Sequence, residues 1–140
     1  MAVSLSEEMQ QAINDAFTDG FPIVWATAGA DQQPVLGFFG TTQAFSDHEI
    51  AVWMRTPERG FLSRIAENPK ATMLYRNTTT RVSFQVHMEA RRVDDDAVRE
   101  RVWSSSAERE REQDPEMKGV AVVCEIVRVI QRGEILMQRD

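Results

Sequence analysis

The stretch from Val52 to Arg76, "VWMRTPERGFLSRIAENPKATMLYR", decides how the middle of the chain folds. Its two ends are apolar runs typical of β-strands, and apolar residues between them recur at the three- and four-residue spacing of a helix. Pro57 ends the first strand, and Asn68-Pro69 ends the helix, because proline fits neither interior. Basic residues lie at the junctions of the two strands with the segment between them, and within that segment, at Arg55, Arg59, Arg64 and Arg76. These arginines need an explanation in a chain whose net charge is −6.

The composition predicts one globular domain. The chain has 140 residues, which is enough to bury a core but too few for two well-packed domains. Hydrophobic residues make up 42% and charged residues 27%, an ordinary balance for a protein that folds. We expect a single domain over residues 1–140, with an N-terminal helix in 1–20 and a barrel in 21–140. Helices are expected near 58–68 and 94–112.

Charge and cysteine content narrow the possible partners. A net charge of −6 argues against nucleic acid, whose phosphates require a basic face. The start "MAVSLSEEMQ" lacks the features of a signal peptide, and no run approaches the ~20 apolar residues of a membrane span. Cys124 is the only cysteine and lies in an apolar run, so we expect a small buried side chain in a reducing compartment. We therefore expect a cytoplasmic protein that binds neither nucleic acid nor membrane.

Helix signals occur at both ends of the chain. Ser4 and Glu7 have capping-box spacing, and apolar residues then recur every four positions in a helix that is expected to end at Gly20. The run Asp94 to Asp96 offers N-caps for a later helix. The charged residues 104–119 after it are expected to form a solvated connector, either a helical extension or a loop.

Strands account for most of the remaining sequence. They are predicted at residues 22–28, 35–40, 49–55, 71–76, 81–93, 120–130 and 134–138. The long strand 81–93 alternates apolar and polar residues, and residues 41–48 are expected to be a loop. Short turns between consecutive strands favour antiparallel pairing, and closing such a sheet removes its exposed edges. The predicted fold class is mainly β with small helices (α+β), arranged as a closed or nearly closed small barrel.

Most familiar catalytic motifs are missing from the sequence. It has no phosphate-binding glycine loop, nucleophile elbow, HExxH or paired CxxC. His48 and His87 lie far apart, and no spacing indicates acidic partners for a zinc ion, so we predict no metal site. Both histidines are expected to be structural or exposed. No side chain stands out as an acid–base catalyst, so the catalytic residues stay unknown.

The arginines near the third strand predict an anion site. If that strand ends near Arg55 and the helix begins near residues 58–60, the free amides of the first helical turn face a small volume. The guanidinium groups of Arg55, Arg59 and Arg64 would converge on the same volume. The alternative is that these arginines pair with Glu58 and Glu67 on a solvated face. The residue pattern leaves both interpretations open.

Two segments resemble a known family. "EIAVWMRTPERGFLSRIAENPKATMLYR" and "RVSFQVHMEARRV" look like the pyridoxamine 5′-phosphate oxidase-like split-barrel flavoproteins, and the likeness extends from about Pro22 to Ile130. It rests on the order of strand, polar turn, helix ending in "ENP" and two further strands. In that family FMN lies at a homodimer interface, and side chains at the third strand and following helix hold its phosphate. The resemblance implies a homodimeric, FMN-binding split β-barrel.

The resemblance also implies which residues bind the cofactor. With the anion argument, it selects Met54, Arg55, Thr56, Arg59, Gly60, Arg64 and Gln85. The first three match the part of the third strand beside the flavin and ribityl chain, and Arg59 and Gly60 match the turn that meets the phosphate. Gln85 matches a glutamine that points at the cofactor. The alternation along its strand places Gln85 on the polar face, as that role requires.

The chain departs from the family in three places. Gly60-Phe61 stands where many members have an Arg-Lys pair, which removes two phosphate-binding charges. The second strand begins with Pro34-Val35 and lacks the arginine that many members place there. The chain ends at Asp140 without the arginine-bearing segment with which true oxidases hold pyridoxal phosphate. Oxidation of pyridoxamine phosphate is therefore not predicted.

The predicted function is hydride transfer between bound FMN and an unidentified small organic substrate or a reduced nicotinamide. The redox chemistry would belong to the cofactor. A deazaflavin coenzyme, which the same family binds, is the alternative cofactor. The other alternative is a non-catalytic flavin- or haem-binding barrel, which a phosphate site with fewer charges would suit.

Overall fold

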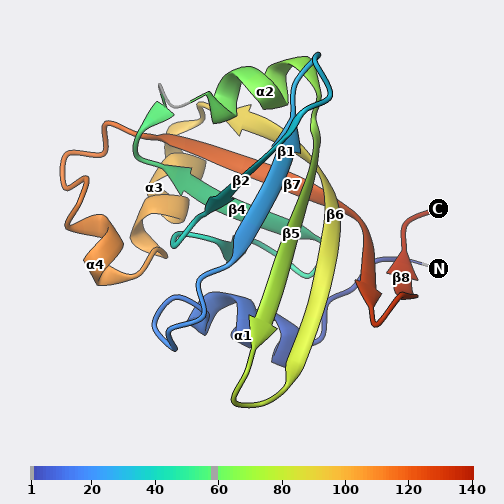
Figure 1. Ribbon diagram of the computed structural model, residues 1–140. Helices are drawn as coiled ribbons and strands as arrows, with labels where there is room; N and C mark the ends of the chain where they lie inside the picture. The colour runs from blue at the N-terminus through green and yellow to red at the C-terminus, as the bar shows by residue number, and fades with distance from the viewer. Residues whose placement is uncertain (1, 58–59) are drawn as a thin grey trace.

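The computed structural model describes residues 2–57 and 60–140 (Figure 1). The elements are α1 (Glu7–Asp15), β1 (Val24–Ala28), β2 (Pro34–Phe38), β3 (Gln43–Ala44), β4 (Glu49–Met54), α2 (Phe61–Glu67), β5 (Lys70–Asn77), β6 (Val82–Val93), α3 (Asp96–Ser104), α4 (Glu108–Arg111), β7 (Val120–Gln131) and β8 (Glu134–Gln138). The strands form one curled antiparallel sheet in the order β2-β1-β5-β6-β7-β4-β3, and β8 pairs with β7 (Figure 1).

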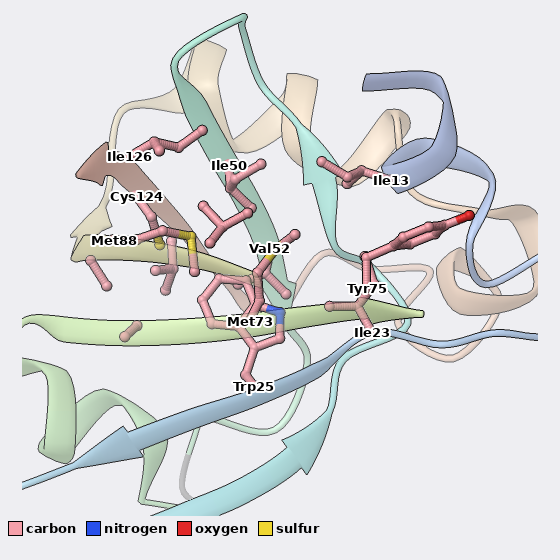
Figure 2. Close-up of a cluster of buried hydrophobic side chains, with 14 of the residues drawn as sticks. Ile13, Ile23, Trp25, Ile50, Val52, Met73, Tyr75, Met88, Cys124 and Ile126 are labelled. Atoms are coloured by element: carbon pink, nitrogen blue, oxygen red, sulfur yellow. The ribbon is translucent and has the colours of Figure 1, made fainter. Parts of the chain in front are cut away.

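The main hydrophobic core fills the concave side of the sheet (Figure 2). Along β6 the apolar residues Phe84, Val86 and Met88 are buried, while Gln85 and His87 between them are only half-buried. This alternation confirms the predicted two-faced strand, since successive side chains of a strand point to opposite faces. Figure 2 shows side chains from β1, β4, β5, β6 and β7 meeting in this core, together with a side chain from α1.

The strands β4 and β7 are buried on both faces. Their inner side chains join the main core, and their outer ones form a second cluster beneath α3. Ala51 and Trp53 of β4 pack there against Val102 of α3. Burial on both faces explains the nearly continuous apolar run "VAVVCEIV" in β7, where alternation would otherwise be expected. Cys124, within that run, is buried as predicted.

The N-terminal helix differs from the prediction at both ends. Its N-cap is Ser6, whose hydroxyl accepts a hydrogen bond from the Met9 backbone N–H at 3.1 Å. The expected capping residue, Ser4, instead donates to Asp47 at 3.0 Å and ties the start of the chain to a distant loop. α1 ends at Asp15, and a turn leads from there to Gly20, whose φ of +87° suits glycine.

Two further regions depart from the predictions, whereas α2 agrees with them. Residues 41–48 contain β3, which pairs with β4 although a loop was expected. The helical region expected at 94–112 is divided into α3 and α4, and Asp95 is the N-cap of α3. At the break between α3 and α4, the buried Ser106 hydroxyl donates back to the carbonyl of Val102 at 2.9 Å, a local bond that competes with continued helix. α2 begins at Phe61, inside the predicted range of 58–68.

Candidate functional site

A pocket of about 350 Å³ lies where β4 ends, between the β1–β2 hairpin and α2. This volume falls within the usual range of small-molecule sites, about 300 to 1,000 Å³. Its lining consists of Trp25, Thr27, residues 35–41, residues 53–56, Phe61, Arg64 and Glu110. The lining includes Met54, Arg55, Thr56 and Arg64, which are all predicted cofactor-binding residues.

The end of β4 holds Arg55 and Thr56 at the pocket. Met54 is the last residue of the strand and is buried, Arg55 is exposed, and Thr56 is half-buried. Gly119, just before β7, allows the close approach of that segment to the end of β4, because a Cβ there would lie 2.5 Å from the Met54 carbonyl oxygen. Pro57 prevents the strand from continuing. The pocket side chains therefore follow from where the sequence stops the strand.

Arg64 links α2 to the hairpin. Its Nε donates to the Thr27 hydroxyl of β1 at 2.9 Å, which holds the half-buried guanidinium group at the pocket. Gly60 precedes α2 with a φ of +90°, and a Cβ at this position would lie 3.0 Å from an Arg64 terminal nitrogen. Gly60 thus turns the chain into the helix and leaves room for Arg64, but it does not itself line the pocket. Arg59 lies outside the described residues.

Arg55 has a partner that the sequence did not indicate. Its Nη1 lies 3.6 Å from the Glu110 Oε2, and Glu110 belongs to α4 in the charged connector. Of the alternative partners, Glu58 lies outside the described residues, and the Glu67 carboxylate accepts a hydrogen bond from the Ala30 backbone N–H at 2.9 Å. The connector is therefore not simply solvated, because it supplies one side of the pocket.

Aromatic rings form the apolar wall of the pocket. Phe39 and Phe61 meet nearly edge to face at 5.0 Å between centroids, and Trp25 lies 5.4 Å from Phe39. The Trp25 Nε1 donates to Thr42 at 2.9 Å, so its polar group is satisfied away from the pocket. Leu36 and Phe38 add exposed apolar surface from β2. Such a wall suits a flat, largely apolar ring.

Trp53, which also lines the pocket, is fixed by a buried carboxylate. Its Nε1 donates to Asp114 Oδ2 at 2.9 Å, and the same carboxylate accepts from the Lys118 and Gly119 backbone N–H groups. Burial by itself would raise the pKa of Asp114, but these hydrogen bonds to the ionised form outweigh it and lower the pKa. Asp114 therefore stays charged and anchors the loop that precedes β7.

Gln85 does not line this pocket within one chain. It lies on the convex face of β6, in a register-matched row across six strands. This outer row consists of Phe38, Val24, Leu74, Gln85, Ile130 and Ile135. Phe38 also lines the pocket, so the row begins at the pocket wall. The outer row is mostly apolar, and three of its members, Phe38, Leu74 and Ile135, are exposed, with Phe38 at 70%.

The two histidines also lie outside the pocket. His87, next to Gln85, accepts from Arg128 at Nδ1 over 3.1 Å, and its Nε2 lies 3.2 Å from Gln85 Oε1. Burial, reinforced by the Arg128 charge, lowers the pKa of His87, so its neutral form donates from Nε2 to Gln85. His48 is exposed, and a hydrogen bond from its ring to Asp47 raises its pKa. In residues 2–57 and 60–140, no cluster of three or more His, Cys, Asp and Glu could hold a metal ion.

Sequence reasoning identified the strand end but missed the other walls. Strand pairing brings Trp25 and Thr27 to the pocket, and the connector brings Glu110, and no local sequence pattern reveals either approach.

Among the helices of the described ranges, none is both long and apolar enough to cross a bilayer.

Comparisons with known proteins identify the fold. No protein-family model matches the sequence, and no curated protein matches it. HupZ from Group A Streptococcus superposes with a TM-score of 0.73 at 15% identity, covering 95% of this chain and 99% of its own. A protein from Clostridium acetobutylicum related to general stress protein 26, of the pyridoxinephosphate oxidase family, has a TM-score of 0.67 at 12% identity and covers 96% of both chains. An FMN-binding protein from Syntrophomonas wolfei has a TM-score of 0.65 at 9% identity, covering 95% of this chain and 89% of its own.

The protein therefore has the split-barrel fold of the pyridoxamine 5′-phosphate oxidase-like and FMN-binding proteins. The fold predicted from the sequence resemblance is confirmed. At identities of 9% to 15% the likeness defines the fold alone, and the ligand has to be argued from this chain's own residues.

Proposed function

We propose that the protein binds FMN in the pocket at the end of β4 and acts as a flavin-dependent oxidoreductase on a small organic substrate. The observation that carries the proposal is the pairing of two guanidinium groups, on Arg55 and Arg64, with an aromatic wall in one pocket of suitable size. Bound FMN would supply the hydride transfer. The protein would bind, orient and shield the cofactor.

The polar side of the pocket fits a phosphate group. Guanidinium groups form strong charge-assisted hydrogen bonds with phosphate oxygens, and Arg55 and Arg64 lie at this side. The hydroxyls of Thr56 and Thr27 add neutral donors close to them. These residues compensate for the absence of a basic pair at Gly60-Phe61. Arg59, which lies outside the described residues, would add a further charge at the head of α2.

The apolar side fits a flat ring system. Trp25 and Phe61 are buried behind Phe39 and hold its half-buried ring rigidly at the pocket. Leu36, at 73% exposure, and Phe38 extend that surface along β2. Covering these side chains with a ring would remove apolar area from water. The ring would then lie beside β2 and β4.

A second copy of the chain would complete the site. The outer row places Leu74, Ile130 and Ile135 in line with Phe38, an apolar stretch of the kind that usually marks an interface. Since Phe38 belongs to both surfaces, a partner packed on the outer row would also border the pocket. In this homodimer, Gln85 of the second copy could reach the cofactor. That would reconcile the predicted role of Gln85 with its position outside the pocket of one chain.

Spectroscopy tests the proposed function. The purified full-length protein is titrated with FMN, riboflavin, a deazaflavin coenzyme and haem, and absorbance and flavin fluorescence are recorded. Saturable binding of FMN, followed by bleaching of its yellow absorption when a reduced nicotinamide is added, is expected. Tight binding of the deazaflavin or haem instead would favour the corresponding alternative. FMN binding that supports no electron transfer with any tested donor would indicate a non-catalytic flavin-binding barrel.

A further inference from the structure

The short helix α4 places one carboxylate against the cationic side of the pocket. Glu108 and Glu112 are exposed, whereas the Glu110 side chain between them turns inward and is only 16% exposed. Glu110 is thus the acidic residue of this segment that reaches the pocket lining. An acidic side chain beside two arginines works against the binding of an anionic ligand, so its position requires an explanation.

The pocket is shaped to accommodate this carboxylate. A Cβ at Gly40 would lie 2.5 Å from Glu110 Oε1, so a side chain at position 40 would collide with the carboxylate where it now lies. Next along α4, Arg111 holds the helix by donating to the Ser104 carbonyl at 3.1 Å. One residue before Glu110, the Arg109 guanidinium lies 5.9 Å from the Phe17 ring centroid. Glu110 therefore occupies a defined place between neighbours that hold α4.

The bond between Glu110 and Arg55 is of a kind that a ligand can replace. The charged atoms are 3.6 Å apart, longer than the 2.7 to 2.9 Å typical of strong charge-assisted hydrogen bonds, and the Arg55 side chain is 42% exposed. Partly exposed pairs of this kind contribute little to stability. A phosphate group carries more charge and more acceptor oxygens than a carboxylate, so it can displace Glu110 from Arg55.

We propose that Glu110 is a built-in competitor for Arg55 that lowers the affinity of the pocket for phosphate-bearing ligands relative to neutral ones. The inference rests on the proposed function, since it concerns the same pocket. A phosphate-bearing flavin must displace the Glu110 carboxylate from Arg55, whereas riboflavin, which has no phosphate, leaves that pair in place. Among the described lining residues, Glu110 offsets one of the two guanidinium charges. The charge at position 110 therefore reduces the preference for FMN over riboflavin that Arg55 and Arg64 would otherwise give.

The test compares Glu110→Gln with the parent and with Glu112→Gln, an isosteric control on the exposed side of the same segment. Glu110→Gln should raise FMN affinity at least about fivefold at low salt, the scale of one unit-charge interaction at about 4 Å in water. Riboflavin affinity should change less than about twofold, and the gain for FMN should shrink as salt screens the charge. Glu112→Gln should match the parent. Melting temperatures of the unliganded proteins confirm that all three are folded.

Two results would overturn the inference. An unchanged ratio of FMN to riboflavin affinity in Glu110→Gln would mean that the carboxylate does not compete. A fall in FMN affinity would mean that Glu110 positions Arg55 for the ligand. If the parent binds no flavin, the proposed function fails separately, and inorganic phosphate becomes the probe. Phosphate should then raise the melting temperature of Glu110→Gln more than that of the parent. Equal rises in the two melting temperatures would contradict competition between Glu110 and phosphate for Arg55.

Discussion

Gln85 is the residue at which the sequence resemblance and the proposed dimer meet. Its Oε1 is occupied by His87, so its amide Nε2 is the group that would donate to a flavin from the second copy. We predict that Gln85→Leu weakens FMN binding by about 1 to 2 kcal/mol, the scale of one lost hydrogen bond with a partner left unpaired. The melting temperature without ligand should stay within a few degrees of the parent, because Gln85 is only half-buried.

A fluorescence titration of Gln85→Leu measures this effect, and Gln113→Leu, on the exposed connector, provides the control. Unaltered FMN affinity in Gln85→Leu would remove Gln85 from the site and would count against the proposed arrangement of the two copies.

Arg64 supports the site with its charge and with its hydrogen bond to Thr27. We predict that Arg64→Met weakens FMN binding by about 1.5 to 3 kcal/mol, since it removes a hydrogen bond to a charged group. Riboflavin binding should weaken much less, because the lost interaction is with the phosphate. Arg76→Met, an exposed change at the far end of β5, should leave both affinities unaltered. An equal loss for the two flavins would show that Arg64 supports the pocket only through packing.

The sequence predicts those site residues whose place depends on the local chain. Arg55 and Thr56 precede Pro57, which ends the strand, so their position at a strand end can be read directly. Glu110 cannot be found this way, because its approach to Arg55 depends on how α3 and the following turn fold back over β4. Its exposed neighbours in a charged run give no signal that this one side chain turns inward.

At the level of elements, the loop before β7 depends on the charge of Asp114. The lowered pKa of Asp114 means that its contribution to stability is fully present above the unfolded-state pKa and is lost as pH falls through the folded-state pKa. We predict that Asp114→Asn lowers the free energy of unfolding at pH 7 by about 1 to 3 kcal/mol, since three donors lose a charged acceptor. Below about pH 4 the difference from the parent should narrow.

Urea denaturation at several pH values measures this difference. Glu116→Gln, a nearby exposed acidic residue, should have an effect close to zero. A stability gap between Asp114→Asn and the parent that stays constant down to pH 3 would contradict the role given to the carboxylate charge.

Strands and helices with a regular spacing of apolar residues were predictable from the sequence. Those that depend on contacts with distant residues were not. The alternation in residues 81–93 predicted β6 and its two faces, since that pattern follows from strand geometry. β3 has only two residues and no period, and the buried Gln43 side chain fixes it by donating to the Val102 carbonyl at 3.0 Å. A long-range hydrogen bond also explains why Ser6 rather than Ser4 caps α1, because the Ser4 hydroxyl donates to Asp47.

For the whole molecule, the outer row predicts self-association. Leu74 lies in that row but does not line the pocket, so it separates the interface from the cofactor site. We predict that the parent is a dimer in solution and that Leu74→Lys is a monomer, because a charge buried in an apolar interface is costly. Val82→Lys is a matched control, since Val82 and Leu74 are both 41% exposed and Val82 lies off the row.

Light scattering with and without FMN measures the assembly. A monomeric parent at micromolar concentration with FMN present would contradict the two-chain site, and a dimeric Leu74→Lys would place the interface elsewhere on the molecule.

The central claim is that this split barrel is built to hold FMN by its phosphate in the pocket at the end of β4. The most direct measurement is a titration of the purified full-length protein with FMN and with riboflavin under the same conditions. Saturation at one FMN per chain, with riboflavin binding more weakly because it lacks the phosphate that Arg55 and Arg64 would hold, is the predicted result. Failure to bind FMN, or equal affinity for the two flavins, would contradict it.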